Sequence, residues 1–152
     1  MSLKEKLQND LTDAMRARDE IRSSTIRMIL TSIKNEEVAG KEARELSDAE
    51  VITVLSREAK KRREAVEAFD QAGAKERADQ ERAEGVVIGE YLPKQLSEAE
   101  IKDLIAAAIS ETGADSPAQM GLVMKSLQPK IAGKADGGLV SSLVKAALAG
   151  GN

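Results

Sequence analysis

The chain has 152 residues, of which 41% are hydrophobic and 32% are charged, and its formal net charge is −3. It contains no cysteine and no histidine, which excludes disulfide bonds, the usual zinc sites and imidazole acid–base catalysis. Phe69 and Tyr91 are the only aromatic residues, so we expect an aliphatic core and no binding of single strands by base stacking. We predict no metal site and no cofactor.

Apolar residues recur with a helical period along almost the whole chain, and no stretch shows the alternation of a strand. We therefore predict an all-α fold. Before Pro93 the pattern predicts four helices, at about 3–17, 20–38, 47–71 and 74–91. Ser47 and Glu50 have the spacing of a capping box, in which each side chain accepts a hydrogen bond from the other residue's backbone N–H. The third of these helices therefore has a defined start.

The segment around Pro93 is the predicted boundary between two domains. Proline lacks a backbone donor and disfavours helix at the residue before it. Ser97 and Glu100 then have the spacing of a second capping box, which predicts that a new helix begins there. The predicted domains are residues 1–93, with four helices, and residues 94–152, with three.

The second predicted domain has three helices separated by turn residues. The first runs from about 97 to 112, the second is predicted to end at Pro129, and the third covers about 137–148. Asp136 is the predicted N-cap of the last helix, because an aspartate there can accept a hydrogen bond from the first free N–H groups.

Charge is distributed unevenly along the chain. Residues 1–93 hold 17 Lys or Arg against 20 Asp or Glu, and residues 94–119 hold two against five. Residues 120–148 hold four lysines against Asp136 alone, a local charge of +3. A uniformly basic nucleic-acid binder is excluded, but this one segment is basic.

The basic segment contains the best candidate for a binding site. Gly137 and Gly138 have no Cβ and allow another backbone to approach, and the first turn of a helix attracts phosphate through its free N–H groups. An ordinary capped turn between helices would have the same residues, and that alternative stays open. The candidate RNA-binding residues are Lys125, Lys130, Lys134, Gly137, Gly138 and Lys145.

A second basic run consists of Lys60, Lys61, Arg62 and Arg63. Its compact charge could contact phosphates as a secondary patch. The spacing of Glu58 to Arg62 and of neighbouring pairs is four residues, however, so ion pairs within the helix would neutralise much of the run. A solvent-exposed helix face is the favoured interpretation.

Three segments of the chain resemble YqeY-like proteins of the GatB/YqeY family. They are IRMILTSIKN at 26–35, YLPKQLS at 91–97 and MGLVMKSLQPKIAGKADGGLVSSLVKAAL at 120–148. The last is also similar to the tail domain of GatB, a subunit of the tRNA-dependent amidotransferase. The resemblance implies a four-helix bundle followed by a three-helix domain, and it points to tRNA. The chain departs from the pattern at Gly85 and Gly89, each costing about 1 kcal/mol relative to alanine within a helix.

We therefore expect a non-catalytic tRNA-binding protein, or an accessory protein of an amidotransferase or aminoacyl-tRNA synthetase. No catalytic residues are predicted, because the serines have no histidine to activate them. One alternative is an adaptor that docks a partner protein in an apolar groove of the second domain. A weaker one, from family association alone, is a carbon–nitrogen ligase with glutamine as amido donor. No apolar run approaches the roughly 20 residues that span a bilayer, so we expect a soluble, cytoplasmic protein without membrane contact.

Overall fold

The computed structural model describes residues 1–150, which form seven α-helices, one short 3₁₀ turn and no strand. The predicted all-α fold is confirmed. The chain divides into two compact units, Met1–Leu92 and Pro93–Asn152, and each has a hydrophobic core of its own. Within residues 1–150, no helix is both long and apolar enough to cross a bilayer.

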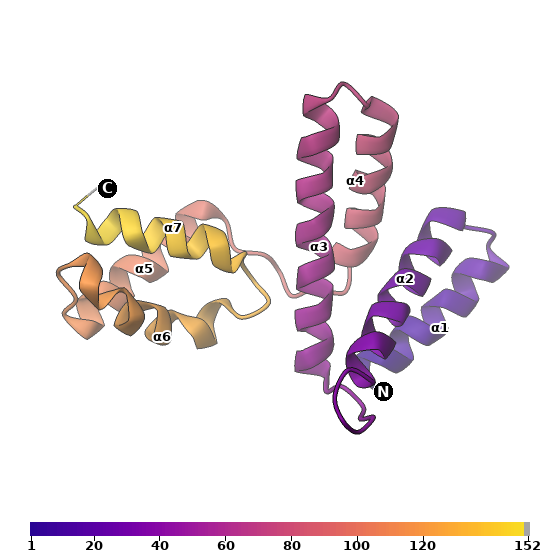
Figure 1. The fold of residues 1–152 in the computed structure, drawn as a ribbon, viewed down its shortest axis with the longest axis horizontal. Coiled ribbons are helices and arrows are strands. Elements are labelled where there is room, and N and C mark those ends of the chain that lie inside the picture. The colour runs from indigo at the N-terminus through magenta and orange to yellow at the C-terminus, as the bar shows by residue number, and fades with distance from the viewer. Residues whose placement is uncertain (151–152) are drawn as a thin grey trace. The chain divides into compact units, whose positions relative to one another are not determined.

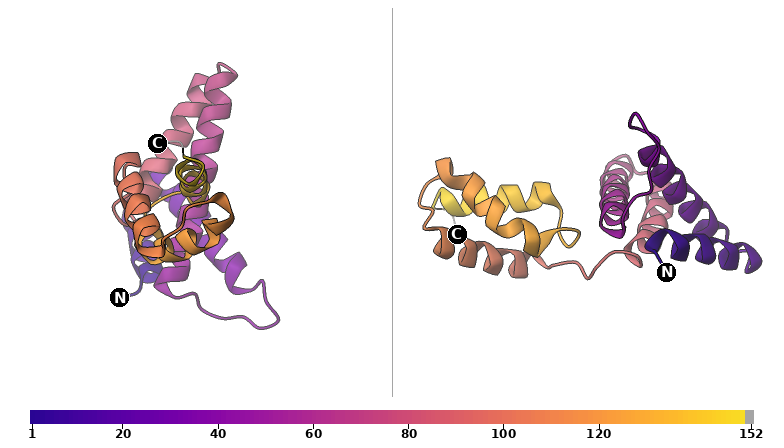
Figure 2. Two further views of the ribbon diagram at one scale, coloured as in Figure 1. Left: turned by 90° about the vertical axis from the view of Figure 1, so that its left-hand side faces the viewer. Right: turned by 90° about the horizontal axis from the view of Figure 1, so that it is seen from below.

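The first unit consists of two helical hairpins that pack against each other. Helices α1 (Leu3–Arg16) and α2 (Glu20–Glu37) lie side by side, as do α3 (Asp48–Gln71) and α4 (Lys75–Gly89) (Figures 1 and 2). Helix α2 also contacts both α3 and α4. The core between the hairpins is aliphatic apart from Tyr91. Its most deeply buried members are Leu7, Ile26, Ile29, Ile33, Val51, Leu55 and Ile88.

The second unit contains α5 (Glu98–Thr112), a 3₁₀ turn (Pro117–Gln119), α6 (Met120–Ile131) and α7 (Gly137–Leu148). Each α-helix contacts the other two, so the three enclose a single core. That core is again aliphatic, with Ile101, Ile105, Val123, Leu127, Val140 and Val144 almost completely buried. Gly113 ends α5 in the left-handed conformation, at a φ of +69° that only glycine adopts without strain.

Both predicted capping boxes are present, at the starts of α3 and α5. The Ser47 side chain accepts a hydrogen bond from the Glu50 N–H at 3.3 Å, and the Glu50 carboxylate accepts one from the Ser47 N–H at 3.2 Å. Ser97 and Glu100 form the same reciprocal pair. Each box satisfies two backbone donors that a helix start otherwise leaves without partners.

Two helix ends differ from the sequence prediction. Helix α6 continues past Pro129 to Ile131, because a proline in the last turn removes only one helical hydrogen bond and Ile131 is buried in the core. Helix α4 ends at Gly89 rather than at Tyr91. Tyr91 lies in the turn that follows, where its side chain is buried against α1 and α2.

Candidate functional site

The α6–α7 loop, residues 132–136, leads directly into the first turn of α7. Asp136 is the N-cap of α7, as predicted, and its carboxylate accepts a hydrogen bond from the Gly138 N–H at 3.2 Å. Gly137 and Gly138 are exposed, and a Cβ placed on Gly137 would meet no atom within 4 Å. The start of α7 is therefore open to a ligand on its solvent side.

Hydrogen bonds on both sides fix the backbone of this loop. The Lys134 N–H donates to the Ile131 carbonyl at 2.8 Å, and Gly133 has a φ of +73°, which accounts for a glycine at this position. From the other side, the Leu96 N–H donates to the Lys134 carbonyl at 2.8 Å, and the Gln95 side-chain amide donates to the Gly133 carbonyl at 2.8 Å. The loop thus has a defined shape.

The predicted RNA-binding residues do not form a single patch. Lys130 and Lys134 are exposed and lie at the loop with Gly137 and Gly138. Lys130 Nζ also lies 3.8 Å from the Glu111 carboxylate, but both side chains are largely exposed, so the pair contributes little.

Lys125 and Lys145 lie apart from the loop. Lys125 is five residues before Lys130, which turns it by about 140° around the helix. Lys145 is in the last turn of α7, about 12 Å along the axis from its first residue. Lys125 and Lys145 are exposed, and neither is within 4 Å of a carboxylate inside residues 1–150. A ligand at the loop could reach them only by extending along α6 and α7.

One residue of the basic run of α3, Arg62, is not exposed as the sequence predicted. Arg62 is turned inward and its side chain is only 12% exposed. The guanidinium pairs with Glu58 at 3.6 Å, the spacing predicted from sequence, and with Glu81 and Glu84 of α4 at 3.4 and 3.3 Å. This correction follows from packing, because the two α4 carboxylates attract the arginine out of solvent. Of the secondary patch, Lys60, Lys61 and Arg63 remain exposed.

The carboxylates around Arg62 hold α3 and α4 together. Glu58 is 5% exposed and also accepts hydrogen bonds from Ser32 and Lys61. Burial, and then the nearby charge of Glu81, raise the pKa of the Glu84 carboxyl. Within residues 1–150 no group of three or more carboxylates is arranged to hold a metal ion. The cluster is a structural ion-pair network. Its carboxylates neutralise the positive charge of Arg62 inside the unit.

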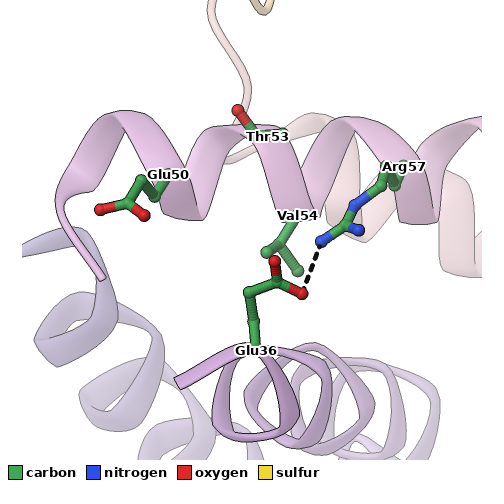
Figure 3. Close-up of a pocket in the computed structure, with 5 residues that line it drawn as sticks. All are labelled: Glu36, Glu50, Thr53, Val54 and Arg57. Atoms are coloured by element: carbon green, nitrogen blue, oxygen red, sulfur yellow. Dashed lines mark hydrogen bonds and ion pairs between the residues drawn. The ribbon is translucent and has the colours of Figure 1, made fainter. Parts of the chain in front are cut away.

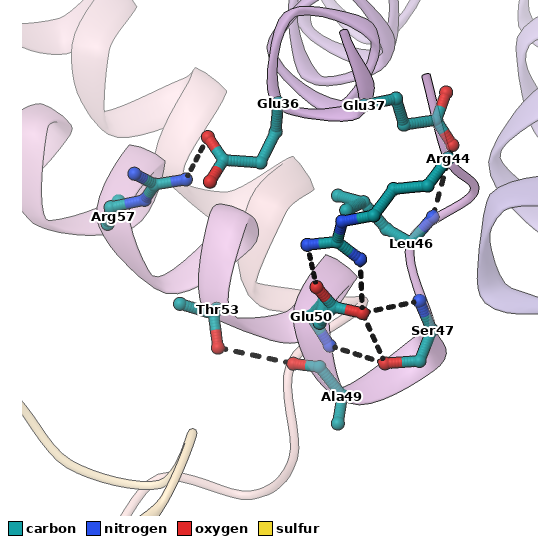
Figure 4. A network of polar contacts seen from close by, with 9 residues as sticks. All are labelled: Glu36, Glu37, Arg44, Leu46, Ser47, Ala49, Glu50, Thr53 and Arg57. Atoms are coloured by element: carbon teal, nitrogen blue, oxygen red, sulfur yellow. Dashed lines mark hydrogen bonds and ion pairs between the residues drawn. The ribbon is translucent and has the colours of Figure 1, made fainter. Parts of the chain in front are cut away.

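A small hollow of about 180 Å³ lies between α2 and α3 (Figure 3). Glu36 and Arg57 face each other across it at 3.3 Å. At its other end Glu50 forms two hydrogen bonds with Arg44, which, with the Ser47 N–H, lower the pKa of Glu50 to about 2 (Figure 4). Each carboxylate here has its own guanidinium, so the hollow has no unbalanced charge with which to select an ionic ligand.

Glu37 lies next to this hollow but is buried, at 5% exposure. Its carboxylate accepts hydrogen bonds from the Lys4 ammonium at 2.8 and 3.0 Å and from the Leu46 N–H at 3.2 Å. The hydrogen bond from Lys4, which outweighs the effect of burial, lowers the pKa of Glu37. One carboxylate thus ties α1, α2 and the segment before α3 together, and Figure 4 shows its bond to Leu46.

An apolar groove of about 490 Å³ runs between α5 and α7. We call it the α5–α7 groove. Ile109 and Leu143 contribute its larger apolar side chains, and three alanines leave the space between the helices open. Lys102, the one charged residue that lines it, pairs with Glu98 at 3.4 Å. The groove is therefore nearly neutral, and its residues are Lys102, Ile105, Ala106, Ile109, Leu143, Ala146 and Ala147.

Comparison with known families identifies the chain. A family model described as Yqey-like protein matches residues 4–148. The chain belongs to the YqeY-like family. The match spans both units, so the predicted resemblance extends over nearly all of the chain and is confirmed.

Two curated relatives of this YqeY-like protein have the same printed name, "Altered inheritance of mitochondria protein 41, mitochondrial". The relative from Lachancea thermotolerans is 29% identical over 147 residues, which cover 93% of this chain and 76% of the relative. The relative from Clavispora lusitaniae is 30% identical over 129 residues, which cover 83% of this chain and 74% of the relative. Both names place those relatives in mitochondria.

The first unit of this YqeY-like protein contains, at its C-terminal end, a network that the sequence did not reveal. The Tyr91 hydroxyl donates to Asp10 at 2.5 Å and accepts from Arg22 at 3.2 Å, and Lys6 Nζ lies 5.4 Å from the centre of its ring. Burial and the Asp10 hydrogen bond raise the pKa of Tyr91 well above its usual value. The two hydrogen-bond partners are 69 and 81 residues away in sequence, so no local pattern signals the network.

Proposed function

We propose that this YqeY-like protein is a non-catalytic accessory protein that binds tRNA through its second unit. The observation that supports this most directly is the exposed start of α7, where Gly137 and Gly138 lie beside Lys130 and Lys134. A helix N-terminus with flanking lysines favours phosphate oxygens. The resemblance of residues 120–148 to the GatB tail domain supports tRNA as the source of those phosphates.

The charge balance restricts where such contact can occur. The first unit, residues 1–92, has a net charge of −3 and repels a polyanion, and the acidic residues 94–119 do the same. Folded RNA read through its backbone does not require aromatic side chains. We propose that contact begins at the α6–α7 loop and extends to Lys125 and Lys145.

The same proposal includes the arrangement and the setting of the protein. We propose that α1–α4 form the family's single four-helix bundle and α5–α7 a GatB-tail-like domain. Any amidation or aminoacylation would be performed by a partner amidotransferase or synthetase. We place the activity in the cytoplasm or, by analogy with the named relatives, in mitochondria.

The test is binding of folded tRNA by the full chain at two salt concentrations. Changing Lys130, Lys134 and Lys145 together to Glu should weaken binding roughly tenfold or more, which corresponds to about 1.4 kcal/mol. The slope of log affinity against log salt should also become shallower by about 2 to 3, since each lost phosphate contact releases about one counterion fewer.

A matched control makes the same change of charge in the first unit. Lys60, Lys61 and Arg63 are changed together to Glu, and Arg62 is kept because it is paired inside the unit. This variant should bind tRNA more tightly than the loop variant. Equal affinities for the wild type and the loop variant would reject the loop as the RNA contact.

The α5–α7 groove favours a second candidate function, an adaptor. Its apolar walls and alanine floor suit the apolar face of a partner protein's helix, since they offer neutral surface to bury. Ala106 and Ala146 are exposed, so changing both to Glu places charge in the groove without altering the core. Docking of this kind should depend weakly on salt, whereas RNA binding should fall steeply.

One retrieval experiment separates the two functions. RNA and protein bound in cells are recovered under mild salt with the wild type, the Lys130/Lys134/Lys145 variant and the Ala106/Ala146 variant. Loss of tRNA from the lysine variant alone supports the RNA function. Loss of one particular protein from the groove variant alone, with tRNA absent from the wild type, supports the adaptor.

A further inference from the structure

The segment Tyr91–Ser97, which the sequence singled out, is anchored at both ends. At its start, Tyr91 is buried in the network with Asp10 and Arg22 in the first unit. At its end, Leu96 packs against the core of the second unit. Between these anchors, the Gln95 side-chain amide donates to the Pro93 carbonyl and to the Gly133 carbonyl, both at 2.8 Å.

The partners of Gln95 and Leu96 belong to the α6–α7 loop. Gly133 and Lys134 offer consecutive carbonyls, and the Gln95 amide and the Leu96 N–H each donate to one of them at 2.8 Å. Two consecutive peptides of the loop are therefore each held through their carbonyl. Backbone carbonyls in the middle of a helix are already occupied, whereas these two loop carbonyls are available to accept both donors.

This attachment determines how the loop presents its polar groups. Lys134 follows the left-handed Gly133, and it precedes the α7 N-cap Asp136 by two residues. A change at the Gly133 backbone would move the Lys134 side chain relative to the start of α7. A loop that is already in its binding shape loses less conformational entropy when it binds a ligand.

We infer that Gln95 is a positioning residue for the α6–α7 loop: its side-chain amide holds the loop in the shape that presents Lys134 and the start of α7. The inference rests on the proposed function in that the presented groups are those of the proposed RNA contact. Gln95 itself is neutral and acts through the Gly133 carbonyl, so it adds no charge that would attract a phosphate.

Amide hydrogen exchange in the full chain tests the positioning directly. Gln95→Ala removes the donor, and Gln95→Glu keeps the shape but places an acceptor opposite two carbonyl oxygens. Exchange of the Leu96 and Lys134 N–H groups should become about five- to tenfold faster in both variants, the factor expected for one lost hydrogen bond. Gln128→Ala, an exposed glutamine of α6, should leave both rates within about twofold, as surface substitutions usually do.

Binding to folded tRNA then distinguishes positioning from contact. Gln95→Ala should weaken tRNA binding severalfold while leaving the salt slope unchanged, because the same lysines still reach phosphates once the loop is ordered. Lys134→Glu should make the slope shallower, because a phosphate contact is lost.

The two readouts fail independently. If the Leu96 and Lys134 N–H groups exchange at wild-type rates in both Gln95 variants, the positioning role is wrong, whatever happens to binding. A fall in affinity without faster exchange would also overturn it, since Gln95 would then touch the RNA itself. If the wild type binds no tRNA, the proposed function is wrong, and the exchange rates alone decide whether Gln95 positions the loop.

Discussion

The two units use their charged side chains differently. In the first unit, Arg62 and Lys4 each pair with a carboxylate on another helix, and these pairs are largely shielded from solvent. In the second unit, Lys125 and Lys145 extend into solvent without an ion pair inside residues 1–150.

This difference shows that local charge density is a poor guide to an available binding surface. The run at 60–63 has the densest positive charge in the sequence, yet one of its members, Arg62, forms ion pairs that join α3 to α4. The lysines at 120–148 are more widely spaced, but they have few acidic neighbours. What matters for a polyanion is the charge that packing leaves unmatched.

The largest expected effect is at Arg62. Arg62→Ala would leave the Glu58, Glu81 and Glu84 carboxylates without their shared cation, at a cost of about 3 kcal/mol in the free energy of unfolding. Tyr91 is the only tyrosine and there is no tryptophan, so tyrosine fluorescence during urea unfolding follows the first unit alone.

The neighbouring arginine is the matched control for that change. Arg63 is exposed, so Arg63→Ala should change the same free energy by less than about 0.5 kcal/mol. Similar losses in the two variants would mean that Arg62 is not the cation that joins the hairpin.

An intermediate effect is expected at Glu37. Glu37→Gln keeps the size of the side chain but removes the charge that binds Lys4 and the Leu46 N–H, which should cost about 2 kcal/mol at pH 7. The matched control is Glu36→Gln, which breaks an exposed pair with Arg57 and should cost less than about 0.5 kcal/mol.

The effect of Glu37 should also depend on pH with a defined sign. Its pKa is lower in the folded protein than the ordinary 4.5, so the stabilisation is fully present above that value and is lost as pH falls through the lower, folded-state pKa. The stability gap between wild type and Glu37→Gln should therefore shrink below about pH 4.5. A gap that widens in acid would contradict the assigned ion pair.

The smallest effect on stability is expected for the lysines of the second unit. Changing Lys125 and Lys145 together to Ala should alter the stability of that unit by less than about 0.5 kcal/mol. Exchange of the buried Val140 and Val144 amides measures this, since the unit contains no aromatic probe. A large destabilisation would show that these lysines also support the fold, and the contrast between the units would disappear.

Signals confined to a few residues predicted the fold well. Two capping boxes, at Ser47 and Ser97, and the N-cap at Asp136 each depend on residues within four positions of one another. The hydrogen bonds that form them can therefore be predicted from the local sequence. The apolar period similarly predicted the helices and the absence of strands within residues 1–150. The error at Pro129 arose because the cost of a proline depends on how much helix follows it.

Features that join distant segments could not be predicted in this way. Arg62 turns inward because of two carboxylates on α4, about 20 residues later. The Gln95 amide meets a carbonyl 38 residues away. Neither position has a local pattern that reveals its partner, because the partner lies on a distant segment, α4 for Arg62 and the α6–α7 loop for Gln95.

Helix α4 has the least support from its own sequence. Its start at Ala74 has no side-chain cap, and Gly85 lies within it, where a Cβ would meet only the Arg62 Cβ at 3.8 Å. Short isolated helices of this kind are unstable in water, so α4 should form only after α3 offers a surface on which to dock.

We therefore place the folding nucleus in α1–α3, with α4 joining after the transition state. Strengthening α4, for instance by Gly85→Ala, should slow unfolding of the first unit and leave its folding rate nearly unchanged.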